Sequence, residues 1–213
     1  MKIIDKTPLH DEKGQLTLAG QIQGRLKYGL NWPAELEAQK LVIQQFDRVL
    51  EKGFVLIRNF TLPKLELVIP IILVGPGGIT VVHVTTAKGH IEANGDQWII
   101  DGKPASINLL TRVSRYARAV QMYLEYQKIN LNNSTVEGAL VAVNPGAQID
   151  SNRPVVRVVR SDAIKQFGTS LLQARPVFRS DVVFTIADRI VEPHVPSETP
   201  AAAPPEVVEA EEP

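Results

Sequence analysis

The sequence predicts an α/β fold in which helices flank a mixed β-sheet. Three observations support this prediction. A stretch with helical periodicity precedes a run of short apolar strands that are joined by glycine turns. A long amphipathic helix follows this run, and further strand and helix patterns come after it. With 213 residues, of which 44% are hydrophobic, the chain is long enough to bury one sizeable core.

Residues 1–30 are predicted to form an N-terminal extension. Apolar residues around Gly20 and Gly24 indicate one or two short strands there: Leu16, Leu18, Ile22 and Leu26. The first helix is expected over Ala34–Lys52, because apolar residues recur at helical spacing after a proline and a glycine follows. Residues 31–191 are then expected to form a single α/β domain.

Four extended segments follow this helix, and turn-forming residues lie between them: Phe54–Phe60, Leu67–Val74, Ile79–Thr85 and His90–Ala93. The dipeptide Asn94-Gly95 is typical of a tight hairpin turn, so Gln97–Ile100 is expected to pair back. The longest apolar run, Leu67–Val84, is interrupted by prolines and glycines. These interruptions favour a buried hairpin over a membrane span.

The second half of the chain begins with a long helix, predicted over Ser106–Gln127. Its buried stripe is expected at helical spacing: Leu109, Val113, Tyr116, Val120, Tyr123 and Leu124. Two strands are expected at Val136–Val143 and Val155–Val159, and Ser161 is a suitable N-cap for a helix that ends near Gln173. The pattern of Ser180–Val191 fits either a helix or a strand. Residues 192–213 are rich in Pro, Ala and Glu and are predicted to be a disordered tail.

Composition narrows the possible classes of function. The chain has 23 basic and 23 acidic residues, so no overall field draws it to nucleic acid or to an anionic membrane. Binding of that kind requires a local patch. The absence of cysteine excludes disulfides, thiolate metal sites and cysteine nucleophiles. The first residues soon become charged and lack the apolar segment of a signal peptide, so we expect a cytoplasmic protein with no membrane partner.

One motif points to a known family. The turn Val74-Gly75-Pro76-Gly77-Gly78 is preceded by Leu62-Pro63 and followed by Gly89 and Trp98. This arrangement closely resembles the NERD (nuclease-related) domain, a branch of the PD-(D/E)xK nuclease-like fold. The resemblance covers roughly 34–143. It implies a restriction-endonuclease-like sheet and DNA-related work in a bacterium or archaeon.

The family's catalytic positions are degenerate in this sequence. By the resemblance, Pro70 replaces an Asp, His83 and Thr85 replace the Glu and Lys of Glu-x-Lys, and Gln39 replaces a helix Glu. Those carboxylates hold the divalent cations that activate water in such nucleases. Proline offers no side-chain ligand, and imidazole is a poor ligand for Mg²⁺. We therefore expect no metal site and no cofactor.

A basic ridge is the candidate for nucleic-acid binding. Arg112, Arg115 and Arg118 lie three residues apart, on the face of the long helix opposite its predicted buried stripe. Such a ridge can contact the phosphates of DNA or RNA. A solvated helix face is the simpler interpretation.

Three functions stay open at this point. The first is a non-catalytic NERD-like module that binds nucleic acid or a protein partner. The second is a Mg²⁺-dependent nuclease with a migrated site, for which the candidates are Glu35, Glu37, Glu66 and Lys88. The third is a purely structural or assembly protein. The joint loss of the family's catalytic residues favours the first function over the second, and the residues do not separate the first from the third.

Overall fold

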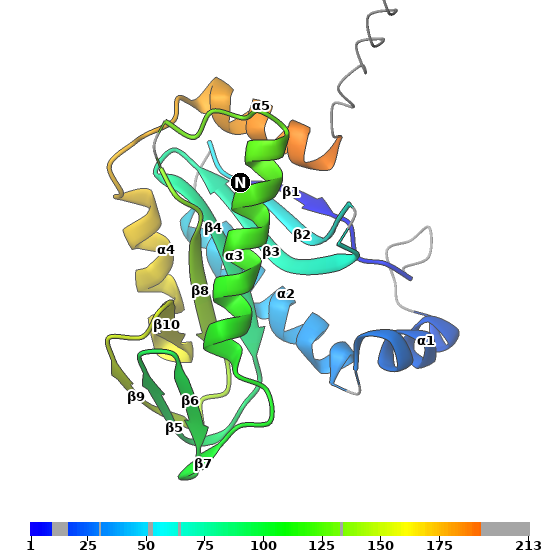
Figure 1. The fold of residues 1–213 in the computed structure, drawn as a ribbon, viewed down its shortest axis with the longest axis vertical. Helices are drawn as coiled ribbons and strands as arrows, with labels where there is room; N and C mark the ends of the chain where they lie inside the picture. Colours follow the sequence, from blue (N-terminus) through cyan, green and yellow to red (C-terminus); the bar gives the residue numbers. More distant parts are fainter. Residues whose placement is uncertain (10–16, 30, 51–52, 64, 133, 193–213) are drawn as a thin grey trace, which may run out of the picture.

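The computed structural model has a mixed α/β fold, as predicted, and it describes residues 1–9, 17–29, 31–50, 53–63, 65–132 and 134–192. The main sheet has six strands in the order β1 (Lys2–Asp5), β2 (Val55–Leu62), β3 (Leu67–Gly75), β4 (Gly78–Thr85), β8 (Glu137–Ala142) and β10 (Arg157–Arg160). A smaller sheet lies below it in Figure 1, in the order β7 (Lys103–Pro104), β6 (Gln97–Ile100), β5 (Gly89–Asn94) and β9 (Ala147–Asn152). The predicted tail from residue 193 onward lies outside the described residues.

The main sheet combines an antiparallel centre with parallel additions. Strands β2, β3 and β4 form an antiparallel meander. Strand β1 pairs parallel to β2, β8 pairs parallel to β4, and β10 pairs parallel to β8. A parallel pair requires a crossover connection, and helix α3 (Leu109–Tyr126) lies within the connection from β4 to β8.

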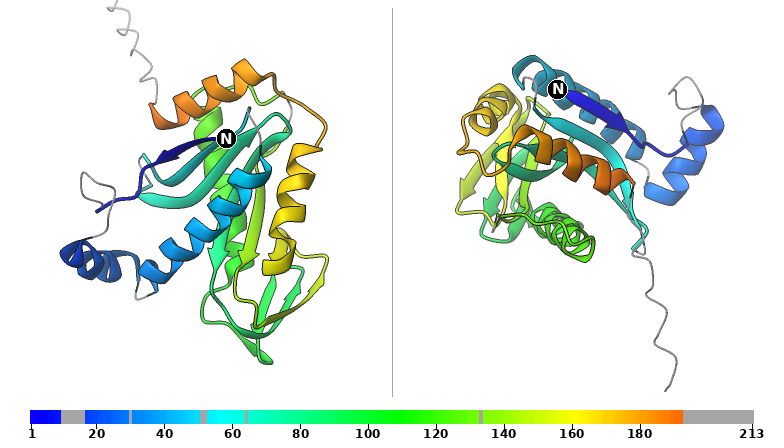
Figure 2. Two further views of the ribbon diagram at one scale, coloured as in Figure 1. Left: turned by 180° about the vertical axis from the view of Figure 1, so that it is seen from behind. Right: turned by 90° about the horizontal axis from the view of Figure 1, so that it is seen from above.

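Helices cover both faces of the main sheet (Figure 2). On one face, α3 and α5 (Ser180–Val191) pack on a cluster that contains Val120 and Ile186. On the other face, α2 (Trp32–Val49) and α4 (Ile164–Leu172) form a second cluster, in which the Phe46 and Phe167 rings lie 5.8 Å apart, edge to face. Among the helices that the structure describes, none combines the length and the apolar character needed to cross a membrane.

In both β2 and β3, the alternation of side chains between the two faces of the sheet shifts by one residue near the middle of the paired segment. The residues that face the α3–α5 cluster are Val55, Ile57, Phe60 and Leu62 in β2, and Leu67, Ile69, Ile72 and Val74 in β3. In both strands the alternation is therefore interrupted once, at Arg58–Asn59 and at Pro70–Ile71. The register passes from Arg58–Ile71 directly to Phe60–Ile69, with Asn59 and Pro70 between them. Proline has no N–H to donate to the ladder, and Asn59 adopts a left-handed φ of 49°.

The predicted strands around Gly20 and Gly24 are wrong, because this segment is a helix, α1 (Leu18–Tyr28). The Thr17 side chain caps it by accepting a hydrogen bond from the Gly20 N–H at 3.1 Å. The two glycines allow neighbouring groups to pack closely against α1. A Cβ on Gly24 would lie 2.0 Å from the Trp32 ring, and a Cβ on Gly20 would lie 2.8 Å from the Leu9 carbonyl oxygen.

The other elements follow the prediction with three differences, and one alternative that the sequence left open is resolved. The buried stripe of α3 contains Leu110 and Ala117, whereas the predicted Leu109 and Tyr116 are only half-buried. Ser161 is not an N-cap, because a short 3₁₀ turn precedes α4. The ambiguous segment Ser180–Val191 is a helix. Strands β1, β7 and β9 have no counterpart in the prediction.

Candidate functional site

A cavity of about 260 Å³ lies where β3 and β4 meet the first halves of α2 and α3. Three of the four degenerate family positions line it: Gln39, Pro70 and His83. Thr85 is buried but is not among the lining residues, and its hydroxyl accepts a hydrogen bond from the Ala87 N–H at 3.2 Å. The fold thus gathers most of the positions that the resemblance assigns to catalysis. The remaining lining residues are Lys27, Trp32, Glu35, Asn59, Glu66, Leu67, Val68, Arg112 and Tyr116.

Gln39 is held in a buried polar network. Its Oε1 accepts hydrogen bonds from Arg58 Nε at 2.9 Å and from Asn59 Nδ2 at 3.0 Å. Its Nε2 donates to Asn59 Oδ1 at 3.1 Å. Arg58 also donates to the Leu36 carbonyl at 2.7 Å and pairs with Asp5 at 3.1 Å. The Gln39 amide is therefore engaged on both ends and ties α2 to β2 and, through Arg58, to β1.

His83 is buried beneath the cavity, with only 4% of its surface exposed. Its Nδ1 has no hydrogen-bond partner among the residues that the structure describes. The Tyr116 ring lies edge-on at 6.0 Å. Burial lowers the pKa of His83 to about 4, and the nearby Arg112 guanidinium contributes to this shift. The imidazole is consequently neutral at pH 7 and brings no positive charge to the cavity.

Glu35 and Tyr116 face the same cavity, and the charge of Glu35 acts on the pKa of Tyr116. Burial raises the pKa of Glu35, while Arg112 acts in the opposite direction. The pKa of Tyr116 is also raised, chiefly by burial, and Glu35 adds to the increase. Glu35, His83, Arg112 and Tyr116 therefore form one electrostatically connected group. Within the described ranges, no three His, Asp or Glu side chains gather in a way that could hold a metal ion.

The family's positions do not fit a Mg²⁺ site. Mg²⁺ prefers carboxylate and water oxygens in an octahedral arrangement. Pro70 has no ligand atom, His83 offers an imidazole, and the Gln39 oxygen already accepts two hydrogen bonds. Glu35 is the carboxylate of α2 that lines this cavity, four residues before Gln39 on the same helix face.

The four candidates for a migrated site separate into two groups. Glu35 and Glu66 line the cavity, and Lys27 from α1 lines it as well. Glu37 is exposed and pairs with Lys40 at 2.7 Å. Lys88 is exposed after the end of β4 and is not among the lining residues. Two carboxylates and a lysine thus line one cavity, but the lysine is Lys27 of α1 and not the predicted Lys88.

The three ridge arginines face different parts of the surface. Arg112 is half-buried at the cavity and also lines a neighbouring groove of about 650 Å³. Arg115 lines that same groove, beside Asn108 and Thr111 at the start of α3. Arg118 lines another groove, next to β8 and the segment before β10. The ridge therefore divides into an Arg112–Arg115 pair and a separate Arg118.

The sequence pattern does not predict that Asn59 and Tyr116 line the cavity. Asn59 reaches the cavity because β2 changes phase beside it, and strict alternation does not predict such a change. Tyr116 fits the helical stripe of apolar residues, and only the observed rotation of α3 places it at the cavity.

Comparison with known proteins agrees with the motif. The family model for the nuclease-related domain (NERD) matches residues 34–143. No curated protein and no solved structure matches the chain. The matched segment spans just over half of the chain and contains every residue that lines the cavity except Lys27 and Trp32. The chain therefore belongs to the nuclease-related domain family.

Proposed function

We propose that this NERD domain binds nucleic acid without cleaving it. The observation that supports this most strongly is the cavity at the family's catalytic positions. There Pro70, His83 and Gln39 stand where the resemblance places carboxylate ligands. Without those ligands, the metal-activated water and the charge stabilisation of the family's chemistry have no support. Arg112 lines this cavity and can contact a phosphate.

The groove beside the cavity supplies the binding surface. Arg112 and Arg115 line it together with the polar side chains of Ser106, Asn108 and Thr111. These residues surround the N-terminus of α3, an 18-residue helix. Asn108 caps the Thr111 N–H at 3.1 Å, and the positive end of the helix dipole still favours phosphate groups. A sugar–phosphate backbone is therefore the ligand that matches the charge of this surface.

The test is a fluorescence-anisotropy titration with single- and double-stranded DNA and RNA over a salt series. We expect binding that weakens as salt increases, because phosphate contacts release counterions. Arg115→Glu should weaken binding about tenfold or more and should lower the salt slope by about 1. Arg118→Glu is the matched control, since Arg118 lies on the same helix but lines another groove.

Two outcomes would contradict nucleic-acid binding at this groove. If no titration shows binding at low salt, nucleic acid is removed as a ligand, and a protein partner or an assembly role becomes the better explanation. If Arg118→Glu weakens binding as much as Arg115→Glu, binding depends on general charge and not on this groove.

Cleavage is tested separately on supercoiled plasmid with Mg²⁺ or Mn²⁺. We expect no nicking. Nicking that follows the protein through purification and disappears with EDTA would contradict a non-catalytic role.

A nuclease with a migrated site is the second candidate, favoured by the shared cavity of Lys27, Glu35 and Glu66. If EDTA-sensitive nicking is found, Glu35→Gln should abolish it. Glu37→Gln should not, because Glu37 is exposed and paired with Lys40 on the same helix. Equal loss in both variants would refute this site.

A further inference from the structure

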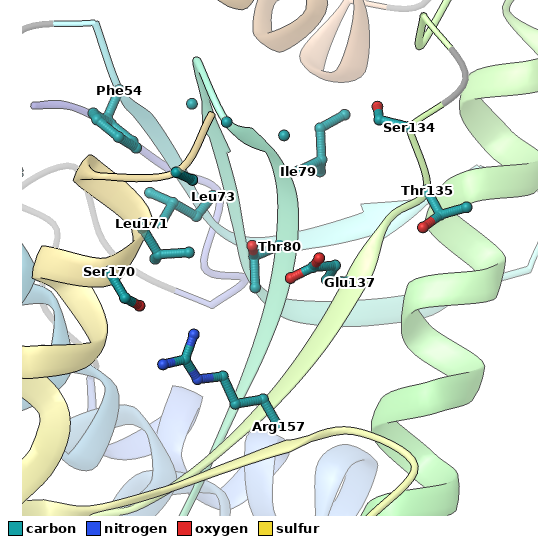
Figure 3. Close-up of a pocket in the computed structure, with 14 residues that line it drawn as sticks. Phe54, Leu73, Ile79, Thr80, Ser134, Thr135, Glu137, Arg157, Ser170 and Leu171 are labelled. Atoms are coloured by element: carbon teal, nitrogen blue, oxygen red, sulfur yellow. The ribbon is translucent and has the colours of Figure 1, made fainter. Parts of the chain in front are cut away.

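A second cavity, of about 460 Å³, is lined by the first residues of β4, whereas His83 lies in the second half of that strand. Figure 3 shows the residues that line this second cavity. This open cavity is bordered by the first residues of β4, β8 and β10, by the end of α4, and by the glycine turn between β3 and β4. Its volume lies within the usual range for small-molecule sites, roughly 300–1,000 Å³. This cavity shares no lining residue with the His83 cavity or with the Arg112–Arg115 groove.

Three polar side chains project from the same face of the main sheet, toward this cavity. Thr80 and Glu137 are register partners on β4 and β8, and Arg157 on β10 is the partner of Ala139. Side chains two residues apart on a strand share a face, so Glu137 lies on the same face as Ala139 and hence as Arg157. In Figure 3 the guanidinium of Arg157 points into the cavity, and the Glu137 carboxylate lies near Thr80.

The two charged side chains that line this cavity are exposed, and neither has a partner of opposite charge in the described part of the chain. Neither Glu137 nor Arg157 forms an ion pair or a side-chain hydrogen bond with any residue in the described part of the chain. Arg157 is nevertheless held in place, because its Cζ lies 4.6 Å from the centroid of the Phe167 ring. By contrast, Arg160 on the same strand pairs with Asp162 at 3.1 Å.

The apolar wall of the cavity is preformed. Half-buried Leu171 lines it together with Phe54 and Leu73, which are 4% and 2% exposed, and the glycine turn fits tightly against Phe54. A Cβ on Gly75 would lie 2.2 Å from the Phe54 ring. The Pro76 carbonyl at the tip of the turn accepts hydrogen bonds from the backbone N–H groups of Val177 and Phe178, at 2.8 and 3.0 Å. A ligand would therefore enter a shape that requires little ordering, which favours binding.

We propose that this cavity binds a free α-amino acid with an apolar side chain. Arg157 pairs with the ligand's carboxylate, Glu137 pairs with its ammonium group, and the Thr80 hydroxyl adds a hydrogen bond. The apolar side chain of the ligand packs on Phe54, Leu73 and Leu171. A phosphate would meet the negative charge of Glu137, and a metal cation would meet the positive charge of Arg157. A zwitterion satisfies both groups at once.

The test uses isothermal titration calorimetry with the full chain and three matched probes. L-Leucine carries both charges, leucinamide lacks the carboxylate, and 4-methylpentanoate lacks the ammonium group. We expect saturable binding of leucine with a Kd of about 1 mM or tighter. Each analogue should bind about 10- to 100-fold more weakly, because a lost charge-assisted hydrogen bond leaves its partner unpaired. Equal binding of the three probes, or no binding of leucine, would overturn the assignment.

Variants distinguish this site from an adventitious one. Arg157→Gln and Glu137→Gln should each weaken leucine binding about 10- to 100-fold. Arg160→Gln, on the same strand and outside this cavity, should leave it unchanged. Circular dichroism confirms that each variant is folded. If Glu137→Gln tightens leucine binding instead, Glu137 and Arg157 close on each other in solution, and the proposed site is refuted. Because this cavity is separate from the Arg112–Arg115 groove, failure here leaves nucleic-acid binding untouched.

Discussion

At the scale of single residues, His83 is the most unusual side chain in the fold. It lies in the centre of a buried strand, between Val82 and Val84, where apolar residues are the rule. Its unpartnered Nδ1 is the single buried side-chain atom of this kind in the described residues. Such groups cost free energy when no hydrogen bond compensates them. The His83 side chain is thus tolerated here in its neutral form, and its burial opposes protonation.

This environment predicts a dependence of stability on pH. The unfolded chain binds a proton at His83 near pH 6.5, whereas the folded chain does so only near pH 4. The unfolded state therefore gains protons first, and the free energy of unfolding falls as pH decreases from about 6.5 to 4. The loss should be about 3 kcal/mol. Urea unfolding followed at several pH values measures it.

His83→Leu is the variant that isolates this contribution. It should reduce the loss of stability on acidification, because it removes the group that titrates. Glu35 titrates with the opposite sign, since its raised pKa favours the protonated folded state at low pH. The comparison is therefore repeated in a Glu35→Gln background. Parallel pH profiles for the variant and its parent in both backgrounds would show that His83 does not control the dependence.

The candidate site was only partly predictable at this scale. The degenerate positions Gln39, Pro70 and His83 line one cavity. For Pro70 and His83 the spacing along the paired strands β3 and β4 accounts for this, whereas Gln39 depends on how α2 packs on the sheet. The resemblance does not show that Lys88 lies outside the cavity, because that depends on the turn after β4. The hydrogen bonds that engage Gln39 also lie beyond any pattern, since its partner Asn59 reaches it through a change of strand phase.

At the scale of elements, α1 packs in an unusual orientation. Its buried face carries Gly20 and Gly24, whereas Leu18, Ile22 and Leu26 are exposed, by 61% to 85%. Small residues let two helices approach closely, and here Trp32 of α2 fills the space over Gly24. An apolar residue pattern normally indicates the buried face of a helix, so sequence alone would assign the wrong face.

Gly24→Ala tests this contact. A Cβ 2.0 Å from the Trp32 ring forces the helix or the ring to move, and overpacking of this kind costs about 1–3 kcal/mol. The gain in helix propensity, about 1 kcal/mol, opposes this cost. We therefore expect a net decrease in stability and an altered emission of Trp32.

The matched control is Gln23→Ala, one position away on the exposed surface of the same helix. It should change the free energy of unfolding by about 0.5 kcal/mol or less. If Gly24→Ala stabilises the protein as a simple gain in propensity would, the close packing of α1 on Trp32 does not hold in solution.

The sequence did not predict the strands in which apolar and polar residues fail to alternate. The central strands are long and apolar, and their positions were confirmed to within a few residues. Strand β9 reads AQIDSN and is mostly exposed, so its sequence resembles a loop, and only pairing with β5 makes it extended. The exposed pattern of β1 is similar, and its parallel pairing with β2 comes from distant sequence.

At the scale of the whole molecule, the family match covers only part of the packed fold. Residues 34–143 contain the meander and α3 but exclude α4, α5, β1 and β10. The excluded helices contribute buried residues to both main clusters, among them Phe167, Val183 and Ile190. A fragment limited to 34–143 would keep α2 and α3 but lose α4 and α5, so it would expose part of each face of the main sheet to water.

We expect this fragment to be insoluble or to lack a cooperative unfolding transition, whereas 1–192 should unfold cooperatively. Circular dichroism during thermal unfolding makes the comparison. A fragment 34–143 that unfolds cooperatively, with a midpoint near that of 1–192, would show that the flanking elements are accessory.

The parallel pairing of β8 with β4 also sets an order of events during synthesis. The meander β2–β3–β4 is built from local antiparallel contacts and can form as soon as residue 85 is available. The outer edge of β4 then stays unpaired until residues 137–142 have been made. An unpaired apolar strand edge is a template for association with other chains. The nascent chain is therefore most prone to aggregation between the completion of β4 and the arrival of β8, a window that includes the synthesis of all of α3.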